Sequence, residues 1–308
     1  MGEVQHLQAG GRIKERAGTE KVMNFFRALF GTSTGTGFTA STLAGLKLHH
    51  VRDVNGFDHG VVYDAKHCQA TTVATVAGTQ PTKEQWEAFE TAMAADKGLI
   101  AMAIAHDGEA TTVGMTFRAT EPKDRKDYTE FLTRLARQGA GVLGAGDDNG
   151  IELHPMDKEA LTHYVASLWG GGDQFPPTAD TGAESWQHIT VAGITRALFD
   201  VDLTVDGIDE RFLAWANDEA MPVAYTRLFR PAQKPDGDGP GRFSGIATIT
   251  ADSVDELNGV AAGLIRMCPA RQRLRIHRML GRQQIGLWAC AGVGVLPWQH
   301  LNLIEEIA

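Results

Sequence analysis

The chain has 308 residues, of which 43% are hydrophobic and 22% are charged. This length and composition exclude a disordered chain and allow one large domain or two modest ones. The net charge of -9 argues against broad affinity for nucleic acid or anionic membranes, because phosphate surfaces are bound by clustered Lys and Arg. We therefore expect no nucleic-acid partner, and any basic contact surface must be local.

The cysteines and the apolar runs indicate the compartment. Cys68, Cys268 and Cys290 are too far apart in sequence for a CxxC motif, and their odd number does not suit a disulfide framework, so a reducing compartment is favoured. The longest apolar run, Ile285–Trp298, contains three glycines and a proline, which is typical of a buried segment rather than a membrane span. Because the N-terminus also lacks a signal-peptide pattern, we predict a cytoplasmic chain without a transmembrane helix.

Residues 12–30 predict a basic amphipathic helix, whose apolar side chains recur at helical spacing. Such a helix either docks on the main body of the protein or attaches to a membrane surface or a partner helix. In the second case Phe26 and Phe30 are predicted contacts. The Gly- and Thr-rich residues 31–37 have the composition of a linker and lack the Gly-Lys-Ser/Thr ending of a phosphate-binding loop. Residues 1–37 are thus predicted as a separate segment.

A first half, residues 38–175, predicts short strands around one capped helix. Thr82 and Gln85 form a capping box before the apolar positions Trp86, Phe89 and Met93. The expected order is strands at 60–64 and 70–76, a helix at 82–95, and strands at 99–106 and 111–119.

A second half, residues 176–308, predicts a similar order. Ser253 and Glu256 repeat the capping signal. The expected elements are a strand within 188–201, strands at 222–230 and 242–250, a helix at 253–267 and a strand at 272–279. Each half reads as strand, strand, helix, strand. We therefore predict an α+β fold of two pseudo-repeated halves with mixed, partly antiparallel sheets, as two units or as one compact domain.

Two helices, at 124–138 and 157–168, are predicted between these repeats, and a glycine-rich loop is predicted at 139–150. The glycines Gly139, Gly141 and Gly144 match the spacing of a dinucleotide fingerprint. That fingerprint needs a strand before it and a helix after it, whereas here a helix precedes it. We therefore interpret these glycines as the end of a helix. The loop at 170–184 is the predicted boundary between the halves.

Two groups of residues suggest metal chemistry. Asp200 and Asp202 follow an apolar strand, and two such carboxylates can hold a divalent cation that bridges a nucleotide-sugar diphosphate. His49, His50, His59 and His67 lie close together in sequence, but adjacent residues of a strand point to opposite faces. We interpret these histidines as solvated or hydrogen-bonded surface residues, and we predict neither a metal nor a cofactor for the chain.

The densest basic cluster lies near the C-terminus. On the predicted strand, Arg271, Arg273 and Arg275 would share one face. Such a face suits a carboxylate-rich partner or anionic lipid head groups, or it is solvated and balanced by acids of the same chain. The predicted partner contacts are Arg271, Arg273, Arg275, Arg278 and Arg282.

The same region carries a family resemblance. The sequence Arg242–Thr250, the following Asp255-Glu256-Leu257, and Leu280–Gln284 resemble the C-terminal part of the EccE component of actinobacterial type VII secretion and of relatives encoded beside conjugation-type ATPases. The resemblance extends more weakly to Gly60–Asp64 and Glu184–His188, and covers residues 40 to 300. The chain departs from the family pattern in two places. It lacks the membrane helices that usually precede the basic segment in the family, and it has Ala289–Gly294 where relatives tend to have a Leu-Pro-Leu-Gly sequence.

The resemblance implies a non-enzymatic structural subunit of a secretion or conjugation complex, because the family is not known for a catalytic centre. Its expected partners are other subunits of that membrane complex, and its expected location is the inner face of the cell membrane, with peripheral contact through residues 12–30. The alternative is a metal-dependent, nucleotide-sugar-binding enzyme or a glycosyltransferase-like relic that uses Asp200 and Asp202.

Overall fold

The computed structural model of the chain describes residues 46–96, 98–108, 110–119, 128–169, 175, 182–231 and 242–299. The predicted basic helix with Phe26 and Phe30, the linker at 31–37 and most of the boundary loop at 170–184 lie outside these residues.

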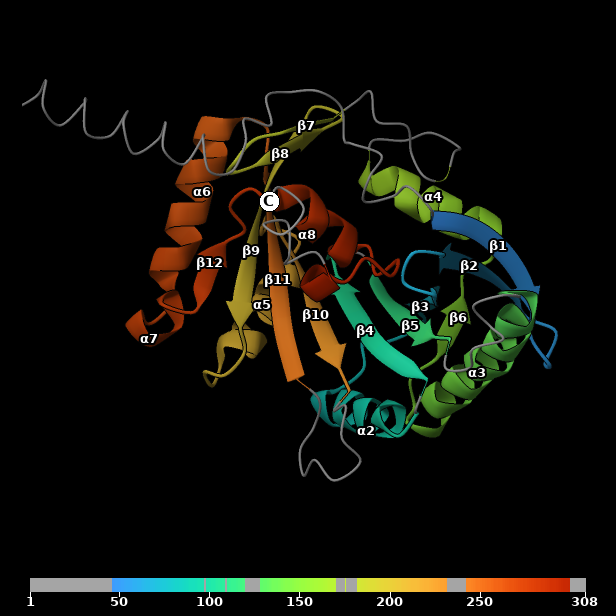
Figure 1. Cartoon of the computed structure of the whole chain (residues 1–308). Coiled ribbons are helices and arrows are strands. Elements are labelled where there is room, and N and C mark those ends of the chain that lie inside the picture. The colour runs from blue at the N-terminus through green and yellow to red at the C-terminus, as the bar shows by residue number, and fades with distance from the viewer. Residues whose placement is uncertain are drawn as a thin grey trace, which may run out of the picture. The chain divides into compact units, whose positions relative to one another are not determined.

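The first half contains six strands and three helices, in the order three strands, helix, two strands, helix, strand, helix (Figure 1). They are β1 (Leu46–Arg52), β2 (Asp58–Asp64), β3 (Gln69–Val76), α2 (Lys83–Ala94), β4 (Leu99–His106), β5 (Thr111–Arg118), α3 (Tyr128–Asp148), β6 (Leu153–Pro155) and α4 (Lys158–Leu168).

The second half repeats this order, with one extra helical turn, α7. Its elements are β7 (Gly182–Glu184), β8 (Ile189–Val191), β9 (Ile194–Asp202), α5 (Ile208–Ala216), β10 (Val223–Arg230), β11 (Arg242–Ala251), α6 (Val254–Met267), α7 (Ala270–Arg273), β12 (Ile276–Arg278) and α8 (Gln283–Cys290), followed by a 3-10 turn at Pro297–Gln299.

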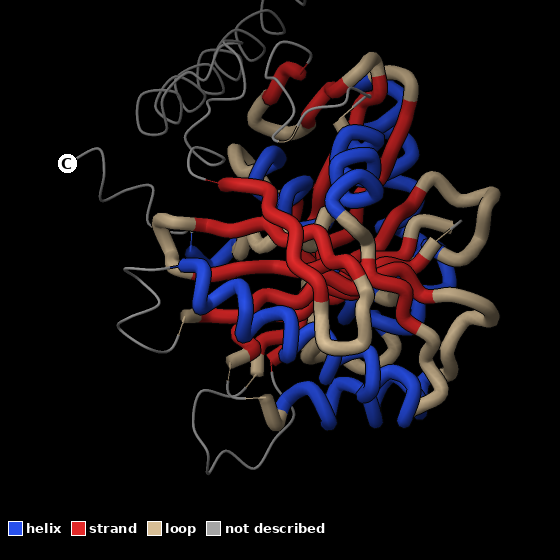
Figure 2. Tube along the Cα trace, turned by 90° about the vertical axis from the view of Figure 1, so that its right-hand side faces the viewer, coloured by secondary structure: helices blue, strands red, loops and turns tan. Residues whose placement is uncertain are grey.

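All the strands belong to one sheet with the order β1-β2-β3-β5-β4-β10-β11-β9-β8-β7 (Figure 2). The short β6 pairs with β3, and β12 pairs with β9 in the corresponding place. The α+β class is therefore confirmed, but two details of the prediction are corrected. Every pairing of the described strands is antiparallel. The repeating unit is also longer than strand-strand-helix-strand, because α3 and α4, which were predicted between the halves, belong to the first unit, and α5, which was not predicted, corresponds to α2.

The two halves meet where β4 pairs with β10, from Tyr225 opposite His106 to Phe229 opposite Met102. Side chains alternate between the two faces of β10. Leu228 packs with residues of α4 and α8, whereas Tyr225 packs with α5 and α6, and Phe229 packs with α2 and α3. The sheet is thus covered by α2, α3, α5 and α6 on one face and by α4 and α8 on the other.

Helix α3 continues through the glycines that were predicted to end it. A Cβ atom at Gly139 would lie 3.1 Å from the ring of His59, and one at Gly146 would lie 2.7 Å from the carbonyl oxygen of Ile151. These glycines therefore let the helix pack closely on its neighbours. The helix ends instead at Gly150, whose φ of 70° is the left-handed conformation of a helix C-terminus.

The described residues belong to one compact unit, Gly37–Ala308. Its longest described helix, α3, has 21 residues and is amphipathic, with Phe131, Leu135 and Val142 buried against the sheet. Within the described ranges, no helix has both the length and the apolar composition that are needed to cross a bilayer.

The segment after α8 returns to the first half. Gln69 of β3 is fully buried, and its side-chain amide donates a 2.8 Å hydrogen bond to the carbonyl oxygen of Gly294. The side-chain amide of Gln299 donates to the side-chain oxygen Oε1 of Gln69 at 2.9 Å. Beside them, the backbone of Gly292 packs directly on Gly114 of β5. The end of the second half is therefore part of the core of the first.

We predict that Gly114→Ala destabilises the protein by about 1–3 kcal/mol, because the added Cβ would collide with the carbonyl oxygen of Gly292. Gly141→Ala in α3 is the matched control. Its Cβ meets no atom within 4 Å, so the free energy of unfolding should rise by about 0.5–1 kcal/mol. Urea denaturation of both variants tests this close contact, and equal midpoints would contradict it.

Candidate functional site

The C-terminal arginines do not lie along one strand. Arg271 and Arg273 belong to the helical turn α7, and only Ile276–Arg278 forms a strand, so the predicted strand at 272–279 was wrong in its first half. The physical reason is Gln272, which is 2% exposed. Its amide donates to the Asp206 carbonyl oxygen at 3.1 Å and accepts from Arg211 at 3.0 Å, and this anchors the turn.

Three of the five predicted contact arginines interact within the fold. Arg275 pairs with Asp202 at 2.9 Å. Arg278 donates to Asn258 at 3.0 Å and lies over the ring of Phe199, and burial lowers its pKa. Arg282 is half-buried and precedes α8. Burial raises the pKa of Asp200, and the charge of Arg282 opposes this shift.

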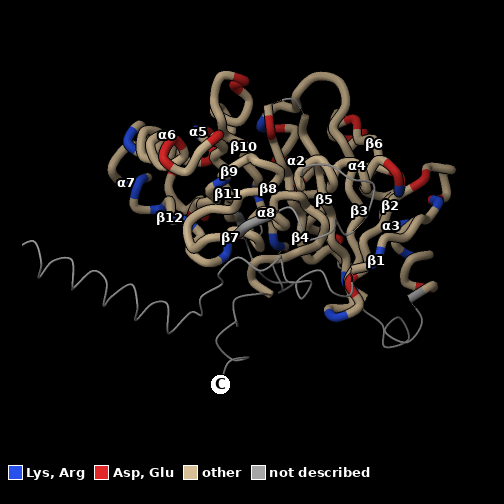
Figure 3. Tube along the Cα trace, turned by 90° about the horizontal axis from the view of Figure 1, so that it is seen from above, with Lys and Arg blue, Asp and Glu red and all other residues tan. Residues whose placement is uncertain are grey.

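Six exposed residues at the end of α6, in α7 and before β12 form what we call the α6–β12 patch. They are Arg266, Met267, Arg271, Arg273, Leu274 and Arg275. Leu274 is 75% exposed and Met267 is 60% exposed. Figure 3 shows Lys and Arg gathered at α7 and the adjacent start of β12. The patch thus combines large apolar side chains with arginines on one surface of a chain that is acidic overall.

Basic side chains lie near both carboxylates of the alternative hypothesis. Asp202 accepts from the backbone of Thr204 and from Arg275, and these contacts hold its pKa below its usual range. Asp200 is opposite His277 of β12. Among the described residues, no three His, Cys, Asp or Glu side chains converge as ligands of a metal would.

His50, His59 and His67 near the N-terminal strands are hydrogen-bonded, although His59 is buried and not at the surface as predicted. His59 and Asp53 form a buried pair at 3.0 Å, His67 bonds Asp64 at 2.6 Å, and His50 shares Asp58 with Arg52. Asp58 therefore has a pKa well below its usual range, because Arg52 and His50 both donate to it.

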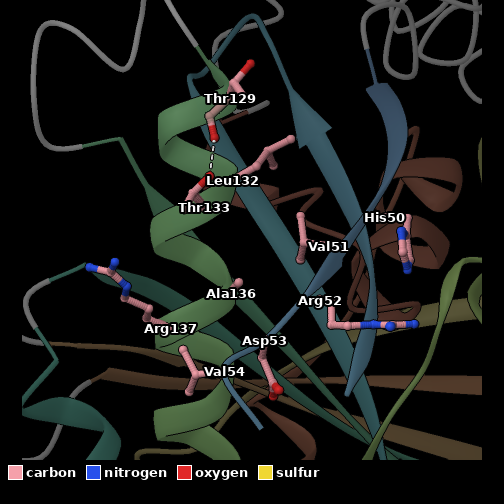
Figure 4. A pocket seen from close by; sticks show the side chains of 10 residues that line it. All are labelled: His50, Val51, Arg52, Asp53, Val54, Thr129, Leu132, Thr133, Ala136 and Arg137. Atoms are coloured by element: carbon pink, nitrogen blue, oxygen red, sulfur yellow. Dashed lines mark hydrogen bonds between the residues drawn. The ribbon is translucent and has the colours of Figure 1, made fainter. Parts of the chain in front are cut away.

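A groove of about 450 Å³ lies beside these histidines, between β1 and α3. Val51, Leu132 and Ala136 face the space between the strand and the helix, while Arg137 points away from β1 (Figure 4). Val54, at the nearby hairpin tip, is 73% exposed. The groove is open, and no serine or cysteine is among its described lining residues.

A buried ionic cluster joins the two halves at the β4–β10 seam. Arg227 of β10 donates to Glu90 of α2 at 2.8 Å, and its Nε lies 3.1 Å from a carboxylate oxygen of Asp209 in α5. Asp209 also accepts from the Tyr225 hydroxyl at 2.8 Å. Arg227 therefore forms an ion pair with one carboxylate of each half. No sequence pattern pointed to this cluster, since its members are separated by up to 137 positions.

This cluster shifts the pKa values of its members. Burial raises the pKa of Glu90 to about 7 although Arg227 opposes the shift, and burial also raises the pKa of Asp209. His106 lies beside the cluster, and its Nδ1 atom forms a 3.0 Å hydrogen bond with the hydroxyl of Thr111. Burial and the charge of Arg227 lower the pKa of His106 to about 4.

The cluster lines a cavity of about 240 Å³ between α2 and α5. Its described lining includes His106, Asp209 and Arg227. Because Arg227 contacts Glu90 of the first half and Asp209 of the second, we interpret the cluster as a structural junction between the halves.

No protein-family model matches the chain, and no curated protein matches it. Among solved structures, it is similar to CrmK, a flavoenzyme of caerulomycin biosynthesis, at 10% identity and a TM-score of 0.32, over 80% of this chain and 64% of that one. It is also similar to a protein named FgChi7B, at 11% identity and a TM-score of 0.31, over 86% of this chain and 65% of that one. The chain thus spans slightly less than two thirds of either structure, and such weak similarity carries no argument about function.

The seam cluster predicts two opposing effects of pH on stability. Glu90 has a folded pKa of about 7 against an ordinary value of 4.5, so it lowers the free energy of unfolding as pH rises through this window. His106 has a folded pKa of about 4 against 6.5, so it raises the free energy of unfolding as pH rises. Between about pH 4.5 and 6.5 the two contributions cancel.

Replacing either residue should leave only the pH dependence that the other causes. As pH rises from 4.5 to 7, the free energy of unfolding of Glu90→Gln should increase by about 3 kcal/mol relative to that of the unmodified protein. As pH rises from 4 to 6.5, the free energy of unfolding of His106→Gln should decrease by about 3 kcal/mol relative to that of the unmodified protein. Urea denaturation across pH 4 to 7.5 measures both profiles. Profiles parallel to that of the unmodified protein would contradict the assignment.

Proposed function

We propose that this chain is a non-enzymatic interaction subunit of a type VII secretion apparatus, similar to EccE, or of a related conjugation complex. It would act at the inner face of the cell membrane and bind neighbouring subunits of the complex through the α6–β12 patch. The resemblance of Arg242–Thr250 and Leu280–Gln284 to that family supports the class of complex, and the patch lies between these two segments.

The exposure of Leu274 and Met267 is the observation that carries this proposal. A leucine that is 75% exposed beside a methionine that is 60% exposed leaves apolar area in water, which a partner surface would remove. Leu274 follows the helical turn α7, and Gln272 within that turn forms two side-chain hydrogen bonds. These bonds fix the backbone that carries the leucine. Fixed apolar side chains lose little conformational entropy on binding.

The charges of the patch indicate the chemistry of the partner. The side chains of Arg266, Arg271 and Arg273 are exposed, and the Arg275–Asp202 pair is partly exposed. Arginine binds carboxylates through paired N–H donors and is enriched at protein interfaces. An acidic partner surface with an apolar centre would therefore complement the patch.

Features elsewhere in the fold support a role without catalysis. Asp200 and Asp202 are surrounded by basic side chains of the same chain, which weakens the nucleotide-sugar alternative. Cys290 has a pKa raised to about 11 by burial, whereas nucleophilic cysteines have lowered values. Cys268 is also buried, as a packed thiol would be.

We predict that the double variant Arg271→Glu with Arg273→Glu reduces recovery of the complex at least about tenfold, which corresponds to about 1.4 kcal/mol of binding free energy. Leu274→Ser should reduce recovery similarly, because it removes the apolar centre. The measurement is quantitative pull-down from cells that express the chain with its native neighbouring genes.

The matched control is Lys47→Glu with Lys66→Glu, which makes the same charge change at two exposed lysines of the first half. This control should retain full recovery. Recovery by the patch variants equal to that of the control would exclude the patch as the contact. Failure of the unmodified chain to recover any membrane-complex component would exclude the proposed function itself.

A further inference from the structure

The face of the seam opposite the ionic cluster contains a cavity of about 310 Å³ between α4 and α8. Its floor is the sheet, where Ala105 of β4 and Ala224 of β10 have small side chains and leave space beneath the helices. Tyr164 and Leu168 of α4 form one wall, and Leu287 of α8 lies on another side. This volume is enough for a small molecule.

Arg196 of β9 lines this cavity and forms no ion pair with any residue that the structure describes. It is half-buried, its Nη1 atom is buried and makes no hydrogen bond with the described residues, and burial lowers its pKa. Asp107 is the one carboxylate among the described lining residues. It forms no ion pair with Arg196, and it accepts from the Ala110 backbone at 2.9 Å. A buried guanidinium donor without a partner is costly, so the cavity is incomplete without an anion.

Hydroxyl groups surround the same space. Thr250 is directly opposite Arg196 in the sheet, and Thr248 follows on the same face. Tyr164 bonds Thr112 at 3.2 Å and keeps its proton, because burial raises its pKa to about 12. The lining hydroxyls belong to Thr112, Tyr164, Thr226, Thr248 and Thr250. These neutral donors and one cation favour an anion.

We propose that this cavity, which we call the Arg196 pocket, binds a small molecule bearing an oxyanion, either a carboxylate or a phosphate monoester. The oxyanion lies at Arg196, Thr248 and Thr250. The rest of the ligand is apolar and packs against Leu168 and Leu287. This ligand site is separate from the α6–β12 patch and does not depend on the proposed role in secretion.

Two probes distinguish the sources of the oxyanion. Hexanoate supplies a carboxylate with an apolar tail, and butyl phosphate supplies a phosphate monoester with one. The full chain is titrated with each probe by isothermal titration calorimetry in a buffer without phosphate or carboxylates. We expect saturable one-site binding of at least one probe, and binding of that probe should weaken at least about tenfold in Arg196→Met and more modestly in Thr248→Val.

The stability of the unliganded variant gives a second readout. Methionine retains the packing of the arginine stem, so Arg196→Met should unfold at the same urea concentration as the unmodified protein or at a higher one. Arg118→Met, at an exposed arginine of β5, is the matched control and should bind the probe normally. Two results would overturn the proposal. One is saturable binding of a probe that is unchanged in Arg196→Met. The other is that neither probe binds at 10 mM, which is about the weakest binding that would matter for a small metabolite. A lower unfolding midpoint for Arg196→Met would also count against it, since it would mean that the guanidinium is stabilised within the empty fold.

Discussion

The pairing of β4 with β10 is the constraint on which the rest of the structure depends. Each half of the chain would otherwise present one of these strands as an unpaired edge, with its backbone donors and acceptors available to other chains. By pairing antiparallel from Tyr225–His106 to Phe229–Met102, the two edges satisfy each other and form one continuous sheet. The ionic cluster and the Arg196 pocket both lie over this line, because it is where helices of the two halves approach each other.

The two faces of the seam have opposite chemistry although they share a backbone. Thr226 and Arg227 are consecutive residues of β10, so their side chains point to opposite faces. On the side of Arg227, carboxylates from α2 and α5 compensate the charge. On the side of Thr226, hydroxyl groups and a single guanidinium surround an open volume. The first face holds the halves together through paired charges, and on the second no described residue forms an ion pair with Arg196.

Local signals in the sequence predicted much of the fold. The capping box of Thr82 and Gln85 is formed, and the Ser253 side chain accepts from the backbone of Glu256 as a helix cap should. The strands of alternating or continuous apolar residues were also found, because burial imposes those patterns directly. The predicted loop at 139–150 was wrong, because Gly139 and Gly146 allow α3 to pack closely on its neighbours and do not end the helix.

The functional surfaces were harder to predict because they depend on distant residues. The arginines from 271 to 275 appeared to lie on a strand, whereas the contacts of Gln272 with Arg211 and Asp206 fix a helical turn there. Asp202 was a candidate metal ligand only in the alternative hypothesis, and in the structure it pairs with Arg275. Neither partner is identifiable from local periodicity. The same holds for Arg196, which no carboxylate of the described residues pairs with.

The return of the last described segment to the first half has a consequence for how the protein forms. Gln69 reaches its hydrogen-bond partners Gly294 and Gln299 across more than 220 positions of sequence. During synthesis, the first strands leave the ribosome long before these partners exist, so a fully buried glutamine must remain hydrated until the chain is nearly finished. Contacts of such long range slow folding, and they make the final step of assembly a joint event of both halves. The repeated architecture therefore does not provide two independent folding units.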